Sequence, residues 1–173
     1  MAQEKIPNYQ DFETLLEKHN REIFVYLWRM LPTPEDAEDC LQDTFLKAYK
    51  AFPRLKNHDH LRAWLYKIAT NTANTHFKKN RDNTIEITEN LPNSNPSIPS
   101  QIESKLLLEE VRSAVEILPK KQRAALMLSK CQHLKYPEIA KVLNISEDSA
   151  RANVYQALKK LRSQFKNRIE AYD

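Results

Sequence analysis

The chain has 173 residues, of which 41% are hydrophobic and 29% charged, and its formal net charge at pH 7 is +4. Its mean hydropathy is −0.68, and it shows neither a run of about 18 apolar residues nor an apolar N-terminal signal, so we expect a cytoplasmic protein without membrane insertion. Glycine is absent, which excludes the glycine-rich loops that hold phosphate groups in nucleotide-binding proteins.

The first part of the chain predicts three helices. Apolar residues recur at helical spacing over residues 8–31, and a proline follows. Thr33 is the predicted cap of a second helix, with Pro34 at its first position, acidic residues in its opening turns and Pro53 at its end. A third helix is predicted over 59–79. Because alternating β-branched runs are few and good helix formers are many, the whole chain predicts an all-α fold.

A break in periodicity divides the chain into two predicted helical domains. Residues 82–100, DNTIEITENLPNSNPSIPS, contain three prolines and many polar residues, which is typical of a flexible linker. Residues 1–81 then form one small domain and residues 101–173 another. Helical spacing resumes in the second domain between Ile102 and Leu118, and a further helix is predicted to begin at Pro119.

The second domain ends in a predicted helix-turn-helix. A short helix over 137–143 is followed by Asn144, the non-glycine residue best able to adopt the left-handed conformation of a sharp helix stop. Ser146 can cap the long helix that follows. A plain helical hairpin is the alternative. The residues of the long helix predicted to face outward and contact DNA are Ser149, Arg151, Ala152, Asn153, Tyr155, Gln156, Lys159 and Lys160.

Charge is unevenly distributed along the chain. Residues 53–81 have a net charge of +6, residues 82–104 of −4 and residues 119–173 of +7. Two basic segments separated by an acidic one suggest two surfaces that bind a polyanion. Cys40 and Cys131 show no disulfide or zinc spacing, so we expect both to be reduced and no metal or other cofactor to be bound.

Two long motifs resemble a known family. Residues 36–77, DAEDCLQDTFLKAYKAFPRLKNHDHLRAWLYKIATNTANTHF, resemble region 2 of extracytoplasmic-function (ECF) sigma factors of the sigma-70 family. Residues 118–162, LPKKQRAALMLSKCQHLKYPEIAKVLNISEDSARANVYQALKKLR, resemble their region 4. The resemblance implies a subunit that directs core RNA polymerase to promoter DNA and has no catalytic centre. It leaves open whether an anti-sigma factor restrains the protein.

The resemblance also implies sites in the first domain. The acidic second helix would dock on the β′ clamp helices of polymerase, and the second domain would meet the β flap. The predicted polymerase-binding residues are Asp39, Gln42, Asp43 and Leu46. The segment after this helix would open the minus-ten promoter element by capturing an unstacked base. The candidates for that pocket are Lys56, Asn57, His58, Asp59, His60 and Asn71, and those for phosphate contacts are Arg62, Lys67, Lys78 and Lys79.

Some assignments stay open at the level of sequence. Trp64 is predicted to be a core residue, with a base-stacking role as the alternative, and Tyr66 poses the same question. Relatives usually have Gly-Leu-Ser-Tyr where this chain has His133, Leu134, Lys135 and Tyr136, so a capping serine is missing and Pro137 is expected to fix the first helical turn instead.

Two other classes of protein are alternatives. A dimeric helix-turn-helix regulator that acts without polymerase would explain the last third of the chain, but it would leave the acidic helix and the basic segment after it without a role. An enzyme has less support, because no paired carboxylates, nucleophile and base, or metal-ligand cluster occur at useful spacing. The residue at position 153 is asparagine where many relatives have arginine or lysine, so the minus-thirty-five sequence cannot be transferred from them.

Overall fold

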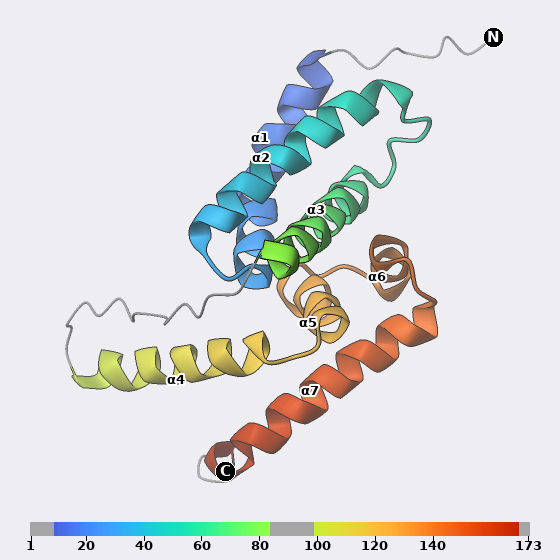
Figure 1. The fold of residues 1–173 in the computed structure, drawn as a ribbon. Helices are drawn as coiled ribbons and strands as arrows, with labels where there is room; N and C mark the ends of the chain where they lie inside the picture. Colours follow the sequence, from blue (N-terminus) through green and yellow to red (C-terminus); the bar gives the residue numbers. More distant parts are fainter. Residues whose placement is uncertain (1–8, 84–98, 170–173) are drawn as a thin grey trace.

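The computed structural model describes residues 9–83 and 99–169, with side chains over 10–79 and 106–166, and all regular structure in these ranges is helical. The all-α prediction is confirmed (Figure 1). In chain order the elements are α1 (Tyr9–Met30), α2 (Pro34–Ala51), the 3₁₀ turn η1 (Phe52–Arg54), α3 (Leu61–Asn83), α4 (Pro99–Glu116), α5 (Lys120–Leu126), the π-helical turn η2 (Met127–Cys131), α6 (Tyr136–Leu143) and α7 (Glu147–Ile169).

Helices α1, α2 and α3 pack together in the first half of the chain. The predicted start of α2 is confirmed, because Thr33 Oγ1 accepts a hydrogen bond from the Asp36 backbone N–H at 3.1 Å. Tyr26 of α1 and Tyr66 of α3 are fully buried and meet edge to face, with ring centroids 5.2 Å apart. Tyr66 is therefore a core residue, and Trp64 packs partly buried against Phe52.

The helix-turn-helix is formed by α6 and α7. Asn144 has φ 52° and ψ 52°, the predicted left-handed conformation, and Ser146 Oγ accepts from the Ser149 backbone N–H at 3.1 Å. Ile139 and Val154 are buried between the two helices and their neighbours. The missing serine before α6 is replaced by Glu138, whose Oε2 accepts from the Lys135 backbone N–H at 2.9 Å, as in half of a capping box.

His133 adopts a left-handed backbone conformation with φ 55°, a region that glycine enters without steric cost. Its side chain is exposed, so the conformation is imposed by the turn between η2 and α6. A non-glycine residue in this region costs about 1–2 kcal/mol.

Replacing His133 by glycine is therefore expected to raise the free energy of unfolding by about 0.5–1 kcal/mol, since the strain relieved exceeds the extra entropy of the unfolded chain. Urea denaturation measures the change. Asn144→Gly is the comparison. Its free energy of unfolding should rise by less, because asparagine tolerates this conformation well. A destabilised His133→Gly variant would show that the imidazole makes a contact worth more than the strain.

The two halves of the chain pack against each other. Helix α6 lies against α3, α5 contacts α1, and the buried residues of both halves form one continuous hydrophobic cluster. Figure 1 shows α5 and α6 beside α3, with α4 and α7 farther away. The sequence predicted two tethered modules but not their contact. The two ends of the predicted linker, 82–83 and 99–100, are helical and belong to α3 and α4, while the rest of it, 84–98, lies outside the described residues.

Helix α4 is less buried than its apolar spacing suggests. Ala114 of α4 reaches the core, as does Leu118 just after the helix, whereas Leu106 and Leu108 of α4 are 57% and 68% exposed and Ile117, which follows it, is 77% exposed. The reason is geometric, because the described part of α4 contacts the rest of the molecule through α7 and through Arg112, whose guanidinium lies 5.7 Å from the Trp28 ring centre of α1.

Candidate nucleic-acid interface

The predicted polymerase-binding residues share one exposed face of α2. Asp39, Gln42, Asp43 and Leu46 are spaced i, i+3, i+4 and i+7 and are all exposed, Leu46 by 57%. Tyr49 continues the face one turn on and is 43% exposed, while its ring contacts Phe12 edge to face. Carboxylates beside exposed apolar side chains suit a specific protein interface. We call Asp39, Gln42, Asp43 and Leu46 the α2 face.

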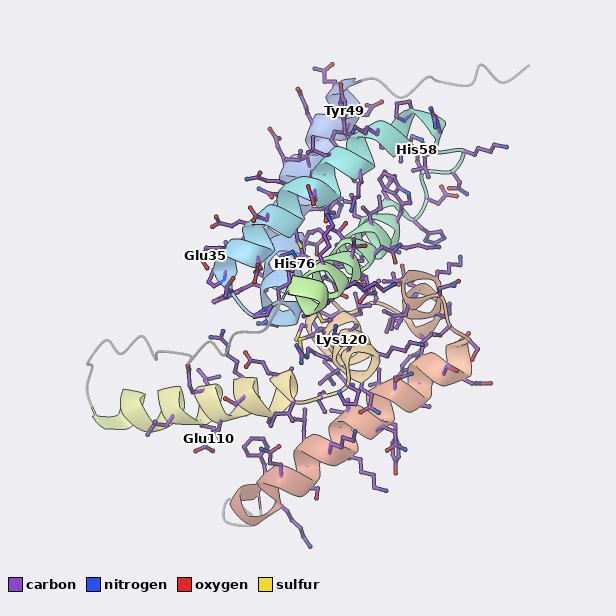
Figure 2. The ribbon with its side chains drawn as sticks, viewed as in Figure 1. Glu35, Tyr49, His58, His76, Glu110 and Lys120 are labelled. Atoms are coloured by element: carbon purple, nitrogen blue, oxygen red, sulfur yellow. The ribbon has the colours of Figure 1, made fainter. Side chains whose placement is uncertain are left out.

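The loop between η1 and α3 is open to solvent. Lys56, Asn57, His58, Asp59 and His60 are all exposed. The loop is shaped by its own side chains, because Asn57 Oδ1 accepts from the Asp59 backbone N–H at 2.6 Å and the His58 ring packs on Phe52 with centroids 5.3 Å apart. Figure 2 shows His58 at the upper end of the molecule, with α7 at the lower end of the view.

Three of the predicted minus-ten residues form a stripe along α3. Lys67, Asn71 and Lys78 are exposed and are spaced i, i+4 and i+11, which puts them on one helical face over about 16 Å. We call them the α3 stripe. Asn71 is about 15 Å from the start of α3 along its axis, so it does not share a pocket with the loop as predicted. Sequence reasoning missed Asn74, which is also exposed beside the stripe.

The other two predicted phosphate contacts lie elsewhere on α3. Lys79 lines a groove between α2 and α3 together with Asp39 and Asp43 of the α2 face. Figure 2 shows His76 in the same place between the two helices, where its Nε2 is 2.8 Å from Asp36 Oδ1. Arg62 points toward α1 and the second half of the chain. Neither residue extends the α3 stripe, and their phosphate contacts stay predictions.

Arg62 forms a two-pronged ion pair with Glu22. Its Nε and Nη2 donate to the Glu22 carboxylate at 2.8–3.0 Å, and His19 Nδ1 contacts the same carboxylate. Burial by itself raises the pKa of Glu22, but the hydrogen bonds from Arg62 and His19 outweigh it, and the pKa lies below the usual 4.5. The ion pair neutralises the positive charge of Arg62, the residue for which the sequence predicts a phosphate contact.

This ion pair predicts an acid-sensitive contribution to stability. Because the folded-state pKa of Glu22 is below its unfolded value, the contribution is complete above about pH 4.5 and is lost as the pH falls through the folded-state pKa. Glu22→Gln should cost about 1 kcal/mol at pH 7, since solvent reaches part of the guanidinium. Urea unfolding from pH 7 to pH 3 should show the variant and the wild type converging; a constant difference would contradict the assignment.

A groove of about 880 Å³ runs beside this ion pair, between α1, the loop and η2. Its wall includes Lys18, Arg21 and Arg29, which are exposed and lie on one face of α1 at i, i+3 and i+11. Sequence reasoning did not select them, because residues 1–33 have no excess of positive charge. Asp11 and Glu22 of α1 line the same groove, so the cations and carboxylates of this helix alternate along one face.

Helix α7 presents its predicted DNA-binding residues to solvent, with Asn153 half-buried. Ala152, Gln156 and Lys159 lie on the side opposite the buried Val154. Arg151 is engaged within the protein, because its Nη2 donates to Glu147 at 2.7 Å and its guanidinium lies 4.7 Å from the Tyr136 ring centre. Asn153 Nδ2 donates to the Ser149 carbonyl at 2.7 Å.

Comparison with known proteins identifies the family. Residues 15–83 match Sigma-70 region 2, and residues 108–161 match Sigma-70 region 4. The chain belongs to the sigma-70 family. As a sigma factor it directs RNA polymerase to promoters, and members of this family are DNA-binding regulators rather than enzymes. The region 2 match ends with α3 at Asn83, and the region 4 match begins within α4.

Relatives of this sigma factor include ECF members, and the chain is of the ECF type. It is 29% identical to RNA polymerase sigma factor YlaC of Bacillus subtilis (strain 168), over 87% of this chain and 89% of that one. It is 28% identical to the ECF RNA polymerase sigma-E factor of Salmonella typhimurium (strain LT2), over 84% and 82% of the two chains. The solved structure of the sigma factor RpoE in complex with the anti-sigma factor NepR from Bartonella quintana matches the fold with a TM-score of 0.74 at 21% identity, over 91% of this chain and 98% of that one.

The structure also bears on metal binding and on membrane insertion. Among the residues it describes, no group of three or more histidine, cysteine or acidic side chains is placed to hold a metal ion. In the same ranges, no helix has the length and apolar character needed to cross a membrane.

Proposed function

We propose that this sigma factor is a dissociable promoter-specificity subunit that binds core polymerase through the α2 face, assists strand opening with the loop and the α3 stripe, and reads the minus-thirty-five element with α7. It acts in the cytoplasm and has no catalytic centre. The observation that carries the proposal is the exposure, in one chain, of an acidic and apolar helix face and of two separate basic surfaces.

The role of the α2 face follows from its composition. Asp39 and Asp43 precede Leu46 on the same face, and Leu46 and the neighbouring Tyr49 are 57% and 43% exposed. Apolar side chains that are exposed together beside charges are typical of a surface that a partner covers. The β′ clamp helices of core polymerase are the partner that the sequence resemblance implies. The negative charge speeds association with a basic partner and is of the wrong sign to bind DNA.

The loop and the α3 stripe support strand opening. Lys67 and Lys78 can hold the phosphates of a strand that runs along α3, and Asn71 between them can hydrogen-bond an unstacked base. The exposed loop lies at the N-terminal end of the same helix, so it can act on a second nucleotide. Each captured base contributes about 1–3 kcal/mol toward opening.

Helix α7 supports duplex recognition. Its first turns carry Ser149, Ala152 and Gln156 toward base edges, and Lys159 and Lys160 lie farther along, where a major-groove helix meets phosphates. Arg151, held by Glu147, is a weaker candidate for base contact than the sequence suggested. An anti-sigma factor is also a proposed partner, since the RpoE structure that shares this fold contains one.

Promoter-directed transcription tests the proposal. Purified chain is added to core polymerase with a library of promoter fragments, and the start points of the RNA products are sequenced. We expect initiation at a distinct subset of promoters, weakening as salt is raised because phosphate contacts release counterions. Core polymerase that gains no specific initiation, together with a chain that binds palindromic DNA as a dimer, would favour the polymerase-independent regulator.

A further inference from the structure

The helix-turn-helix holds one arginine by contacts from both of its helices. Arg151 of α7 donates from Nη2 to Glu147 Oε1 at 2.7 Å, and its guanidinium lies over the ring of Tyr136, the first residue of α6, with Cζ 4.7 Å from the ring centre. Figure 1 shows α6 beside the N-terminal end of α7, where these residues meet. The orientation of the Arg151 side chain is therefore set before a partner binds.

Tyr136 is a fixed platform for this contact. It is partly buried and packs against the hydrophobic cluster that contains Ile139 and Val154. The Arg151 side chain above it is 57% exposed. A cation over an aromatic ring is attracted by the negative charge of the ring face, so Tyr136 holds the guanidinium without adding a charge that would repel DNA. The arginine is positioned and still open to solvent.

Arg151 lies on a flank of α7 and not at the centre of its outward face. Ala152 and Gln156 lie near that centre, opposite the buried Val154. Each residue advances about 100° around a helix, so Arg151 is displaced from Ala152 by that angle. Arg162, eleven residues farther on, is exposed on the same flank. When a helix lies in the major groove, its centre meets base edges and its flanks meet the phosphates on either side.

The chemistry of Arg151 suits a phosphate. A guanidinium has five N–H donors at the edge of its plane, and within the described part of the chain Arg151 gives one side-chain hydrogen bond, to Glu147. Tyr136 covers a flat face of the group, so the other donors at its edge stay available for a two-pronged contact with phosphate oxygens. The first helix of this motif crosses the DNA backbone, which places Tyr136 of α6 and the arginine above it next to phosphates.

We propose that Arg151 is a phosphate clamp of the minus-thirty-five site and that Tyr136 is the residue that positions it without touching DNA. This inference rests on the proposed function of α7. It gives Arg151 to the DNA backbone and leaves sequence reading to the centre of the outward face. A side chain that is already held in place loses less conformational entropy when DNA binds, so Tyr136 raises the affinity for DNA whatever its base sequence.

Neutralising single phosphates maps the contact of Arg151. The full chain with core polymerase is bound to promoter duplexes in which one phosphate of the minus-thirty-five element is an uncharged methylphosphonate. Replacing the phosphate that Arg151 holds should weaken binding of the wild type about tenfold. Arg151→Gln should bind the unmodified promoter less tightly by a similar factor and should be insensitive to that replacement. Its plot of log affinity against log salt should be shallower by about 1.

Substitutions that keep or remove the ring test Tyr136. Tyr136→Phe should bind promoter DNA like the wild type, because the ring face is kept. Tyr136→Leu should weaken binding about two- to fivefold, and it should have no further effect when Arg151 is already glutamine. Tyr136→Met is a second variant without a ring, and circular dichroism confirms that each variant is folded. Lys159→Gln is the comparison, since it removes another cation of α7 and should leave the sensitivity to the Arg151 phosphate unchanged.

The contrary results are distinct for each residue. An Arg151→Gln variant that stays sensitive to every phosphate, or that instead loses its preference at one base pair, would overturn the phosphate clamp. If Tyr136→Leu weakened binding equally with and without Arg151, Tyr136 would have a purely structural role. Failure of the proposed function differs from both, because the wild type itself would then show no dependence on any phosphate of the minus-thirty-five element.

Discussion

Reversing the charge at Asp43 is expected to weaken binding to core polymerase by about tenfold to a hundredfold. Asp43 lies in the middle of the α2 face, between Asp39 and Leu46, and its side chain is exposed in the free protein. A lysine there replaces an attractive contact with a repulsive one at the centre of the proposed interface, where substitutions have their largest effects. Binding of labelled chain to core polymerase, followed by fluorescence anisotropy at fixed salt, measures the loss.

Glu13→Lys is the matched control for this prediction. Glu13 is an exposed acidic residue of α1 outside the α2 face, so its reversal changes the net charge by the same amount. The control should bind core polymerase within about twofold of the wild type, since a distant exposed charge is screened at physiological salt. Equal affinity for the Asp43 variant and the wild type would rule out the α2 face as the docking surface.

Replacing Asn71 by alanine is expected to slow promoter opening by about tenfold and to change duplex binding by less than twofold. The Asn71 side chain is exposed on α3 between Lys67 and Lys78, so its removal leaves the phosphate contacts of the α3 stripe in place. What is lost is the hydrogen bonding to an unstacked base, which exists only after the strands separate. Fluorescence of 2-aminopurine in the minus-ten element follows opening, and gel mobility shift follows binding.

The control for Asn71 is Asn20→Ala, an exposed asparagine on α1 away from the loop and the α3 stripe. It should affect neither measurement. If the Asn71 variant lost duplex binding and opening to the same extent, the residue would be part of a general DNA contact, and its assignment to base capture would be wrong.

Much of the fold could be predicted because its signals are local. Thr33 and Pro34 at the start of α2, and Asn144 and Ser146 in the turn before α7, are residues whose own side chains or backbone preferences fix a helix end. Such signals need no knowledge of the rest of the chain. The family could be predicted for the same reason, since both sequence motifs are continuous.

The contacts between the halves could not be predicted, because they depend on residues far apart in sequence. Nothing in the spacing around Gln132 indicates that its amide meets Tyr66, or that Arg62 pairs with Glu22 on another helix. The family resemblance and the positive charge of Arg62 predict a phosphate contact, and neither indicates its ion pair with Glu22. The spacing in the sequence already places Lys67, Asn71 and Lys78 on one helical face. That Lys79 instead lines a groove with α2 depends on the position of α2 beside α3.

We propose that one chain holds two separate promoter segments while polymerase opens the downstream one. The most direct test is a footprint of the full chain with core polymerase on a promoter that it selects, combined with permanganate probing of unpaired thymines. The account predicts two protected patches centred about 25 base pairs apart, with reactive thymines confined to the downstream patch. A single protected patch, or a duplex that stays paired throughout, would contradict it.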